Sequence, residues 1–230
     1  MTWDLVVRGG TVVDGTGLSR RRADVAVKAG RIAAVGHVPG VQDAHRTLDA
    51  DGMIVAPGII DLHTHYDPQL TFDPWATSSC YHGVTTVLAG NCGFSIAPTR
   101  AQARPYIKAM FAKVEGMEPV ALDGVEWDFE SFPEYLAARE GRLGVNMACY
   151  VGHSSIRRFV MGADGSERHA TPEEIEAMRA LVREAMAAGA AGFSSSSVPT
   201  QVDGDDRPIP SGFASREELV GLWEGAGAAS

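Results

Sequence analysis

The pattern of apolar and polar residues changes character near residue 53. Before it, short apolar stretches of strand length alternate with turns that contain glycine, and no helical period is present. The stretches 23–29 and 31–35 flank Gly30 and predict a β-hairpin. We therefore expect residues 1–52 to form a small β domain.

From residue 53 onward, continuous apolar runs alternate with helical patterns. Runs without polar alternation are typical of strands buried on both faces of a parallel sheet. Capping-box sequences at Ser131–Glu134 and Thr171–Glu174 predict two helix starts, and Ser215 precedes a third helix. The helix after Thr171 carries an apolar stripe at 175, 178, 181, 182 and 185. The predicted strands lie within residues 54–65, 84–89, 144–151 and 190–194.

This βα alternation indicates an α/β fold, either a doubly wound sheet or a (β/α) TIM-like barrel. A complete barrel has eight units and takes about 250 residues. Residues 53–230 supply four βα units, so under the second interpretation they form the first half of a barrel.

Composition and charge exclude several classes of function. The 230-residue chain carries a formal net charge of −9, which argues against nucleic-acid binding because phosphate neutralisation needs clustered Lys and Arg. No apolar run reaches the roughly 18 residues that span a bilayer, so we expect no membrane partner. The three cysteines are odd in number and widely spaced, which predicts free thiols and a reducing, cytoplasmic location.

Two histidines at the end of the first apolar run form the strongest chemical signal. Because strand side chains alternate between faces, Asp61, His63 and His65 point to one side. Two imidazoles one pleat apart can chelate a divalent transition metal. In a barrel, the carboxyl ends of the strands face the active site. We therefore predict that His63 and His65 bind a metal.

Cys92 follows the next predicted strand, in the segment Gly90-Asn-Cys-Gly93. A thiolate is a soft ligand that can bridge two ions, and its place at the same sheet edge makes Cys92 a candidate third ligand. Cys80 lies in a helix-like segment and Cys149 inside an apolar strand, so we interpret both as structural.

His153 ends the third predicted strand, and its role stays open between a metal ligand, a substrate contact and a polar strand cap. A serine run at 194–197 ends the fourth strand. No base is placed beside it by sequence, so we set a Ser-His-Asp hydrolase aside. Nucleotide-binding glycine loops are also missing from the sequence.

Three segments resemble the amidohydrolase superfamily and, within it, the D-aminoacylase (N-acyl-D-amino-acid deacylase) family. The His-x-His pattern is shared across the superfamily, whereas Gly90-Asn-Cys-Gly93 points to the D-aminoacylase branch. The resemblance covers essentially the whole chain and implies a small β-sandwich portion followed by a metal-dependent (β/α) barrel. The segments that carry it are residues 4–17 with 30–36, residues 56–67 and residues 82–95.

The resemblance also implies a site and a reaction. His63, His65 and Cys92 would hold one or two zinc ions, and the thiolate would take the bridging place that a carboxylated lysine fills in many superfamily members. None of the three lysines ends a predicted strand. The substrate would be a small N-acyl-D-amino acid, cleaved to a carboxylate and a D-amino acid. Family members draw further histidines and a catalytic aspartate from later strands, so we assign no catalytic residue here and keep His153 as a substrate-contact candidate.

Two alternatives remain open. One is a different amidohydrolase reaction, such as the ring opening of a dihydropyrimidinase or hydantoinase, because one superfamily site serves many substrates. The other is an inactive N-terminal fragment of a truncated or split enzyme. Because open sheet edges tend to pair, we expect such a chain to self-associate or to bind a complementing C-terminal half.

Overall fold

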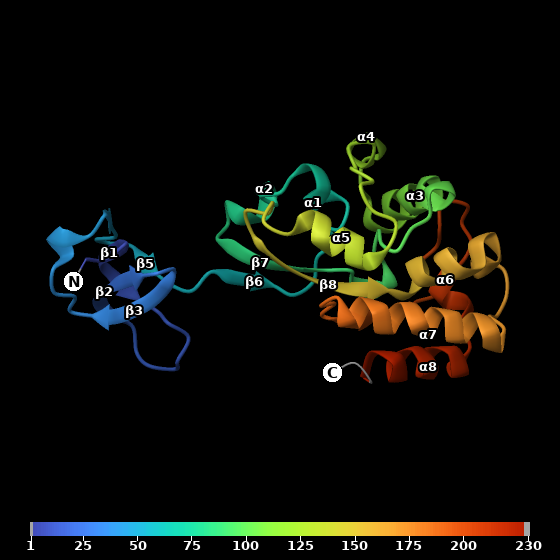
Figure 1. The fold of residues 1–230 in the computed structure, drawn as a ribbon. Coiled ribbons are helices and arrows are strands. Elements are labelled where there is room, and N and C mark those ends of the chain that lie inside the picture. The colour runs from blue at the N-terminus through green and yellow to red at the C-terminus, as the bar shows by residue number, and fades with distance from the viewer. Residues whose placement is uncertain (1, 228–230) are drawn as a thin grey trace. The chain divides into compact units, whose positions relative to one another are not determined.

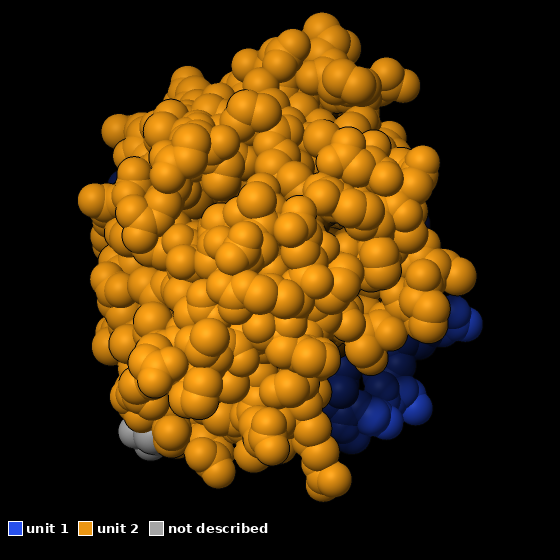
Figure 2. Space-filling view, turned by 90° about the vertical axis from the view of Figure 1, so that its right-hand side faces the viewer, with its two compact units in different colours: residues 1–58 blue, residues 59–230 orange. Residues whose placement is uncertain are grey.

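The computed structural model describes residues 2–227, which fold into two compact units divided between Gly58 and Ile59. Figure 1 traces the chain, and Figure 2 distinguishes the two units by colour. Each unit has its own sheet, and helices follow the strands of the second unit, so the protein is a mixed α/β structure. The sequence pattern predicts that the first domain ends at residue 52, whereas the boundary between the two compact units falls between residues 58 and 59.

The first unit is a five-stranded mixed sheet. Strand β1 pairs antiparallel with β2 and parallel with β4 and β5. Strand β2 also pairs antiparallel with β3. Ala29 and Gly30 have φ angles of 51° and 71° in the turn between β2 and β3, as the left-handed hairpin turn requires. The predicted hairpin is therefore confirmed. The elements are β1 (Leu5–Val12), β2 (Arg21–Lys28), β3 (Arg31–Gly36), the 3-10 turn η1 (Val41–Asp43), β4 (Arg46–Asp49) and β5 (Ile54–Val55).

The second unit is built on a parallel sheet of order β6-β7-β8-β9. Its strands are β6 (Ile59–Asp61), β7 (Val84–Ala89), β8 (Asn146–Gly152) and β9 (Gly192–Ser194). All three pairings are parallel, so the carboxyl ends of the four strands meet at one edge of the sheet. The side chains that follow these ends are therefore brought together.

Helices connect the strands and bury the core. Helices α7 and α8 pack side by side (Figure 1), and a large apolar core joins the sheet to the longer helices. The helices are α1 (Gln69–Phe72), α2 (Thr77–Cys80), α3 (Arg104–Glu115), α4 (Pro119–Leu122), α5 (Phe132–Arg139), α6 (His153–Met161), α7 (Pro172–Ala187) and α8 (Arg216–Gly227). Short 3-10 turns are η2 (Asn91–Gly93), η3 (Ala101–Ala103), η4 (Gly162–Ser166) and η5 (Pro210–Phe213).

One predicted strand is wrong in its extent. The run at 54–65 is divided between the two sheets, because Ile54–Val55 pairs with β1 in the first unit and only Ile59–Asp61 joins the parallel sheet. Pro57 and Gly58 separate the two parts; proline has no backbone N–H to donate to a ladder. His63 and His65 therefore lie just beyond β6 rather than inside a strand.

The helix starts agree with the sequence pattern. Both capping boxes form, at Ser131 with Glu134 and at Thr171 with Glu174. The predicted stripe of α7 faces inward, with Met178 among its fully buried members. Within residues 2–227, no helix combines the length and the hydropathy that crossing a membrane would require.

Candidate metal centre

The structure brings His63, His65 and Cys92 together at the carboxyl edge of the parallel sheet. One ligand atom from each side chain lies within 4.8 Å of the other two. The Nε2 atom of His63 is 3.1 Å from the Sγ atom of Cys92. Ligands about 2.1 to 2.3 Å from a tetrahedral zinc ion lie roughly 3.5 Å apart, so these three donors fit one ion with small adjustments.

Thr64, between the two histidines, anchors the segment that carries them. Its backbone N–H and its hydroxyl both donate to the carbonyl of Leu88 in β7, at 3.0 and 2.9 Å. The side-chain amide of Asn91 donates to the same carbonyl at 2.7 Å and to the Thr64 carbonyl at 3.2 Å. This shared carbonyl ties the histidine segment to the loop of Cys92 and fixes the distance between them.

The Cys92 loop requires an unusual backbone. Cys92 itself has a left-handed φ of 55°, and Gly90 has a φ of 72°. A Cβ atom on Gly90 would lie 2.0 Å from the carbonyl oxygen of Tyr150, so only glycine fits there. The sheet must approach the loop this closely for the thiol to face the histidines.

Ser194, at the end of β9, holds the same loop from the other side. Its hydroxyl accepts from the Gly93 N–H at 2.9 Å and donates to the Gly90 carbonyl. The buried carboxylate of Asp67 accepts from the Gly90 N–H at 3.0 Å. The sequence did not predict that Ser194 and Asp67 hold this loop. The serine run indicates only a polar strand end, and the contact between Ser194 and Gly93 spans 101 residues.

Burial disfavours the charged forms of His65, Cys92 and Asp67. Desolvation, followed by the nearby His63, lowers the pKa of His65 to about 4, so its imidazole is neutral at pH 7. Burial first, and then Glu115, raises the pKa of the Cys92 thiol. Burial raises the pKa of Asp67 to about 7. The neutral imidazole of His65 and a thiol that a cation would ionise are donors of the kind that zinc prefers.

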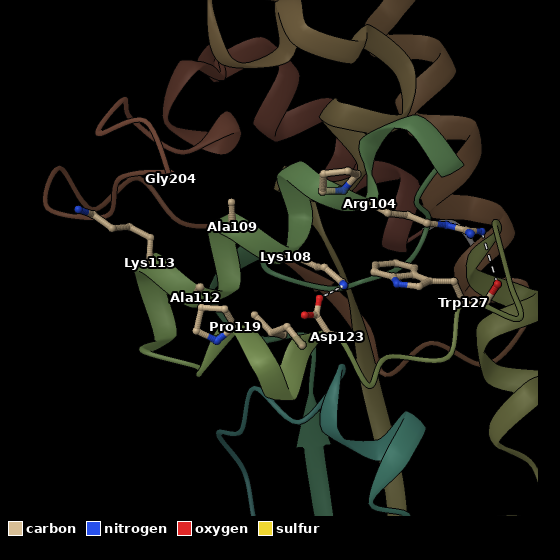
Figure 3. A pocket seen from close by; sticks show the side chains of 11 residues that line it. Arg104, Lys108, Ala109, Ala112, Lys113, Pro119, Asp123, Trp127 and Gly204 are labelled. Carbon is tan, nitrogen blue, oxygen red and sulfur yellow. Dashed lines mark hydrogen bonds and ion pairs between the residues drawn. The ribbon is translucent and has the colours of Figure 1, made fainter.

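The three ligand candidates line a cavity of about 480 Å³ together with Lys113, Glu115 and residues 200–202. A larger cavity of about 750 Å³ lies along α3 (Figure 3). Its lining is mostly apolar, and an ion pair of 2.7 Å joins its Lys108 to Asp123. Lys113 lines both cavities. The smaller cavity is the candidate metal site, because it alone of the two holds the clustered nitrogen and sulfur donors.

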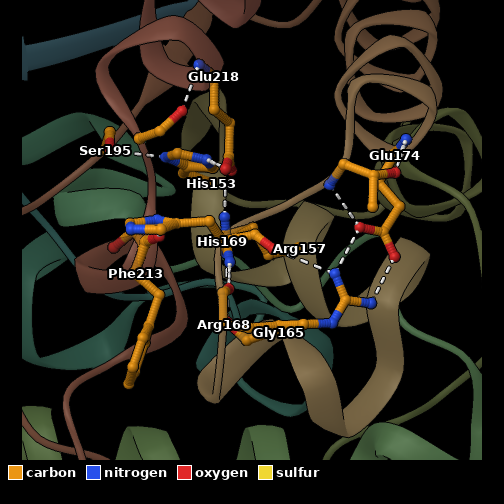
Figure 4. A network of polar contacts seen from close by, with 12 residues as sticks. His153, Arg157, Gly165, Arg168, His169, Glu174, Ser195, Phe213 and Glu218 are labelled. Atoms are coloured by element: carbon orange, nitrogen blue, oxygen red, sulfur yellow. Dashed lines mark hydrogen bonds and ion pairs between the residues drawn. The ribbon is translucent and has the colours of Figure 1, made fainter.

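His153 lies outside this cluster in a buried network (Figure 4). Its Nδ1 atom is 2.8 Å from the Ser195 hydroxyl and its Nε2 atom 2.8 Å from Oε1 of Glu218. Arg157 donates to the other oxygen of Glu218. Burial lowers the pKa of His153; burial opposes ionisation of Glu218, but its bonds to His153 and Arg157 lower its pKa overall. A substrate contact by His153 would require this network to open.

The network also supplies the base that the sequence did not place beside the serine run. Ser195, His153 and Glu218 form a serine–histidine–carboxylate chain. The imidazole and the carboxylate are both fully buried, and the carboxylate is paired with Arg157. The arrangement therefore ties α6 to α8 rather than presenting a nucleophile.

The other cysteines take no part in the cluster. Cys149 is buried, with its Sγ atom 3.7 Å from Oδ1 of Asp67, and Cys80 donates to the Thr77 carbonyl. All three thiols are free.

Residues 46–208 match the model of the amidohydrolase family. The chain belongs to the amidohydrolase family. It is 45% identical to D-aminoacylase from Alcaligenes xylosoxydans xylosoxydans over 197 residues, which are 84% of this chain and 37% of that protein. It is 40% identical to N-acyl-D-aspartate deacylase of the same organism, over 83% of this chain and 36% of that protein. This amidohydrolase chain thus spans little more than a third of the length of these relatives.

A solved structure agrees with these matches. The N-acyl-D-glutamate deacylase from Bordetella bronchiseptica, complexed with zinc and a phosphonate that mimics the tetrahedral intermediate, superposes with a TM-score of 0.80 at 35% identity. The match covers 99% of this chain and 44% of that chain. Both units of the amidohydrolase chain therefore have counterparts in an enzyme that binds zinc.

Proposed function

We propose that this chain provides the metal-binding half of a zinc-dependent hydrolase that cleaves N-acyl-D-amino acids. The observation that carries the proposal is the cluster of His63, His65 and Cys92, whose ligand atoms lie within 4.8 Å. The identity to D-aminoacylase and to an N-acyl-D-aspartate deacylase supports the substrate class.

In the proposed reaction, the oxygen of water bonds to the acyl carbon and the C–N bond breaks. The products are a carboxylate and the free amine of a D-amino acid. One or two zinc ions, when bound, would polarise the amide carbonyl and lower the pKa of water. His63 and His65 would bind as neutral imidazoles and Cys92 as the anionic donor. No residue of this chain is assigned as the general base.

The proposed architecture follows the same relatives. Residues 53–230 would be the first half of a (β/α) barrel, and residues 1–52 part of a β-sandwich. Four parallel strands with their carboxyl ends at one edge support this assignment. The proposal places the protein in the cytoplasm, with a small-molecule substrate and a complementing C-terminal half as its partners.

The test uses a chimera in which this chain replaces the matching segment of D-aminoacylase. Release of free amine from a panel of N-acetyl-D-amino acids is measured with added Zn²⁺. We expect turnover by the chimera and its loss on Cys92→Ala, with Cys80→Ala as the matched control. Undiminished turnover after Cys92→Ala would overturn the ligand role. Hydrolysis of hydantoins or dihydropyrimidines alone would favour the cyclic-amidase alternative.

A further inference from the structure

Helix α3 ends beside the metal centre with a carboxylate. Oε2 of Glu115, the last residue of α3, lies 3.4 Å from Nε2 of His65 in the cavity that holds the three ligand candidates. Both side chains are mostly buried, at 18% and 14% exposure. A strong N–H···O bond spans about 2.7 to 3.2 Å, so this contact is too long to be one.

The surroundings are unfavourable for a carboxylate without a cation. The carboxyl end of a helix carries the negative end of the helix dipole, which destabilises a negative charge. Lys113, the basic residue in the last turn of α3, pairs instead with Asp206 at 2.7 Å. Among residues 2–227, His65 is the one ion-pair partner of Glu115, and their 3.4 Å separation is too long for a hydrogen bond.

The separation of the two side chains matches that of two ligands on one ion. Donor atoms about 2.1 Å from a tetrahedral zinc ion lie about 3.4 Å from each other. Glu115 lies outside the group that the other three residues form within 4.8 Å, so its carboxylate must move closer to the other donors to complete the set. Glu115 is the last residue of α3, and the helix stops at Gly116, which has a φ of 65°.

We propose that Glu115 is a further ligand of this metal centre and binds the ion beside His65. The proposal rests on the proposed function, because it takes the ion to lie at His63, His65 and Cys92. Two imidazoles, one thiolate and one carboxylate give zinc four donors of the types it prefers. The carboxylate comes from a helix, 50 residues beyond His65 in the sequence.

The test is a competition titration of Zn²⁺ against a chromophoric chelator, using the whole chain. We expect Glu115→Gln, which keeps the size of the side chain, to weaken zinc binding by about 10- to 100-fold. Glu118→Gln is the charge-matched control, because Glu118 is exposed three residues further on. It should bind zinc within about twofold of the unmodified chain. Circular dichroism confirms that each variant is folded.

A second readout locates the effect. With Co²⁺ in place of zinc, the sulfur-to-cobalt charge-transfer absorption should persist in Glu115→Gln and disappear in Cys92→Ala. Equal zinc affinity in Glu115→Gln and the unmodified chain, or equal losses in both glutamine variants, would overturn the inference alone. Unchanged zinc binding in Cys92→Ala would overturn the proposed centre itself.

Discussion

At the scale of single residues, the candidate site depends on a few positions that have no room for an additional side-chain atom. Gly90 is the clearest of these, because the Tyr150 carbonyl occupies the space of a Cβ atom. The sequence identified His63, His65 and Cys92 because all three follow the carboxyl ends of strands that meet at one edge; the alternation argument does not apply to the histidines, which lie beyond β6. It could not identify Glu115 or Ser194, because their contacts with His65 and with the Cys92 loop depend on how distant parts of the chain pack together.

Gly90→Ala should reduce the free energy of unfolding by about 3 kcal/mol, from a left-handed φ and a backbone clash together. Gly116→Ala is the matched control: its φ is 65°, against 72° for Gly90, and its Cβ would meet no atom within 4 Å. The control should lose only about 1 kcal/mol, the cost of the φ angle alone. Urea denaturation measures both values. Equal losses would contradict the close approach of Tyr150.

At the scale of elements, the local sequence predicted where helices begin, but it did not predict every partner of the side chains at those positions. The capping boxes of α5 and α7 form as the pattern predicts. Ser215 and Glu218 have the same spacing, and Ser215 does accept from the Glu218 N–H at 3.1 Å. The Glu218 carboxylate, however, turns inward to His153 and Arg157, because those buried groups need a charged acceptor more than an exposed helix end does.

The capping box of α7 predicts an acid-dependent contribution to stability. The bonds from Arg168 and from the Thr171 N–H lower the pKa of Glu174 to about 2, below the 4.5 of an unperturbed glutamate. Glu174 therefore stabilises the folded state above pH 4.5, and this contribution is lost as the pH falls through about 2.

The measurement is urea unfolding of the unmodified chain and Glu174→Gln between pH 2 and 7. The variant should be less stable near pH 7, and the difference should shrink toward pH 2. Glu173→Gln, an exposed change in the same turn, is the control and should show a smaller pH-dependent difference. A difference that stays constant down to pH 2 would contradict the ion pair with Arg168.

At the scale of the whole molecule, the described sheet of the second unit is open at β6. This strand pairs only with β7, and its exposed side chains are apolar. Ile60 is 58% exposed and Leu62, just beyond the strand, 68%. The alternation of strands and helices predicted a parallel sheet, but the pattern alone could not locate the division of the run at 54–65 between two sheets. An unpaired apolar edge favours association with another chain.

We expect the chain to form concentration-dependent oligomers and Ile60→Lys to shift it toward the monomer. Val120→Lys is the control, because Val120 is equally apolar and 79% exposed but lies on α4, away from the sheet edge. Light scattering coupled to size-exclusion chromatography measures the mass of each species. A monomer at every concentration of the unmodified chain would show that the β6 edge drives no association.

The most direct measurement of the central claim is zinc K-edge X-ray absorption on the purified chain. We expect bound zinc with a single sulfur at about 2.3 Å and nitrogen or oxygen donors at about 2.0 to 2.2 Å. The sulfur should vanish in Cys92→Ala. A chain that retains no zinc, or a zinc ion with no sulfur among its ligands, would contradict it.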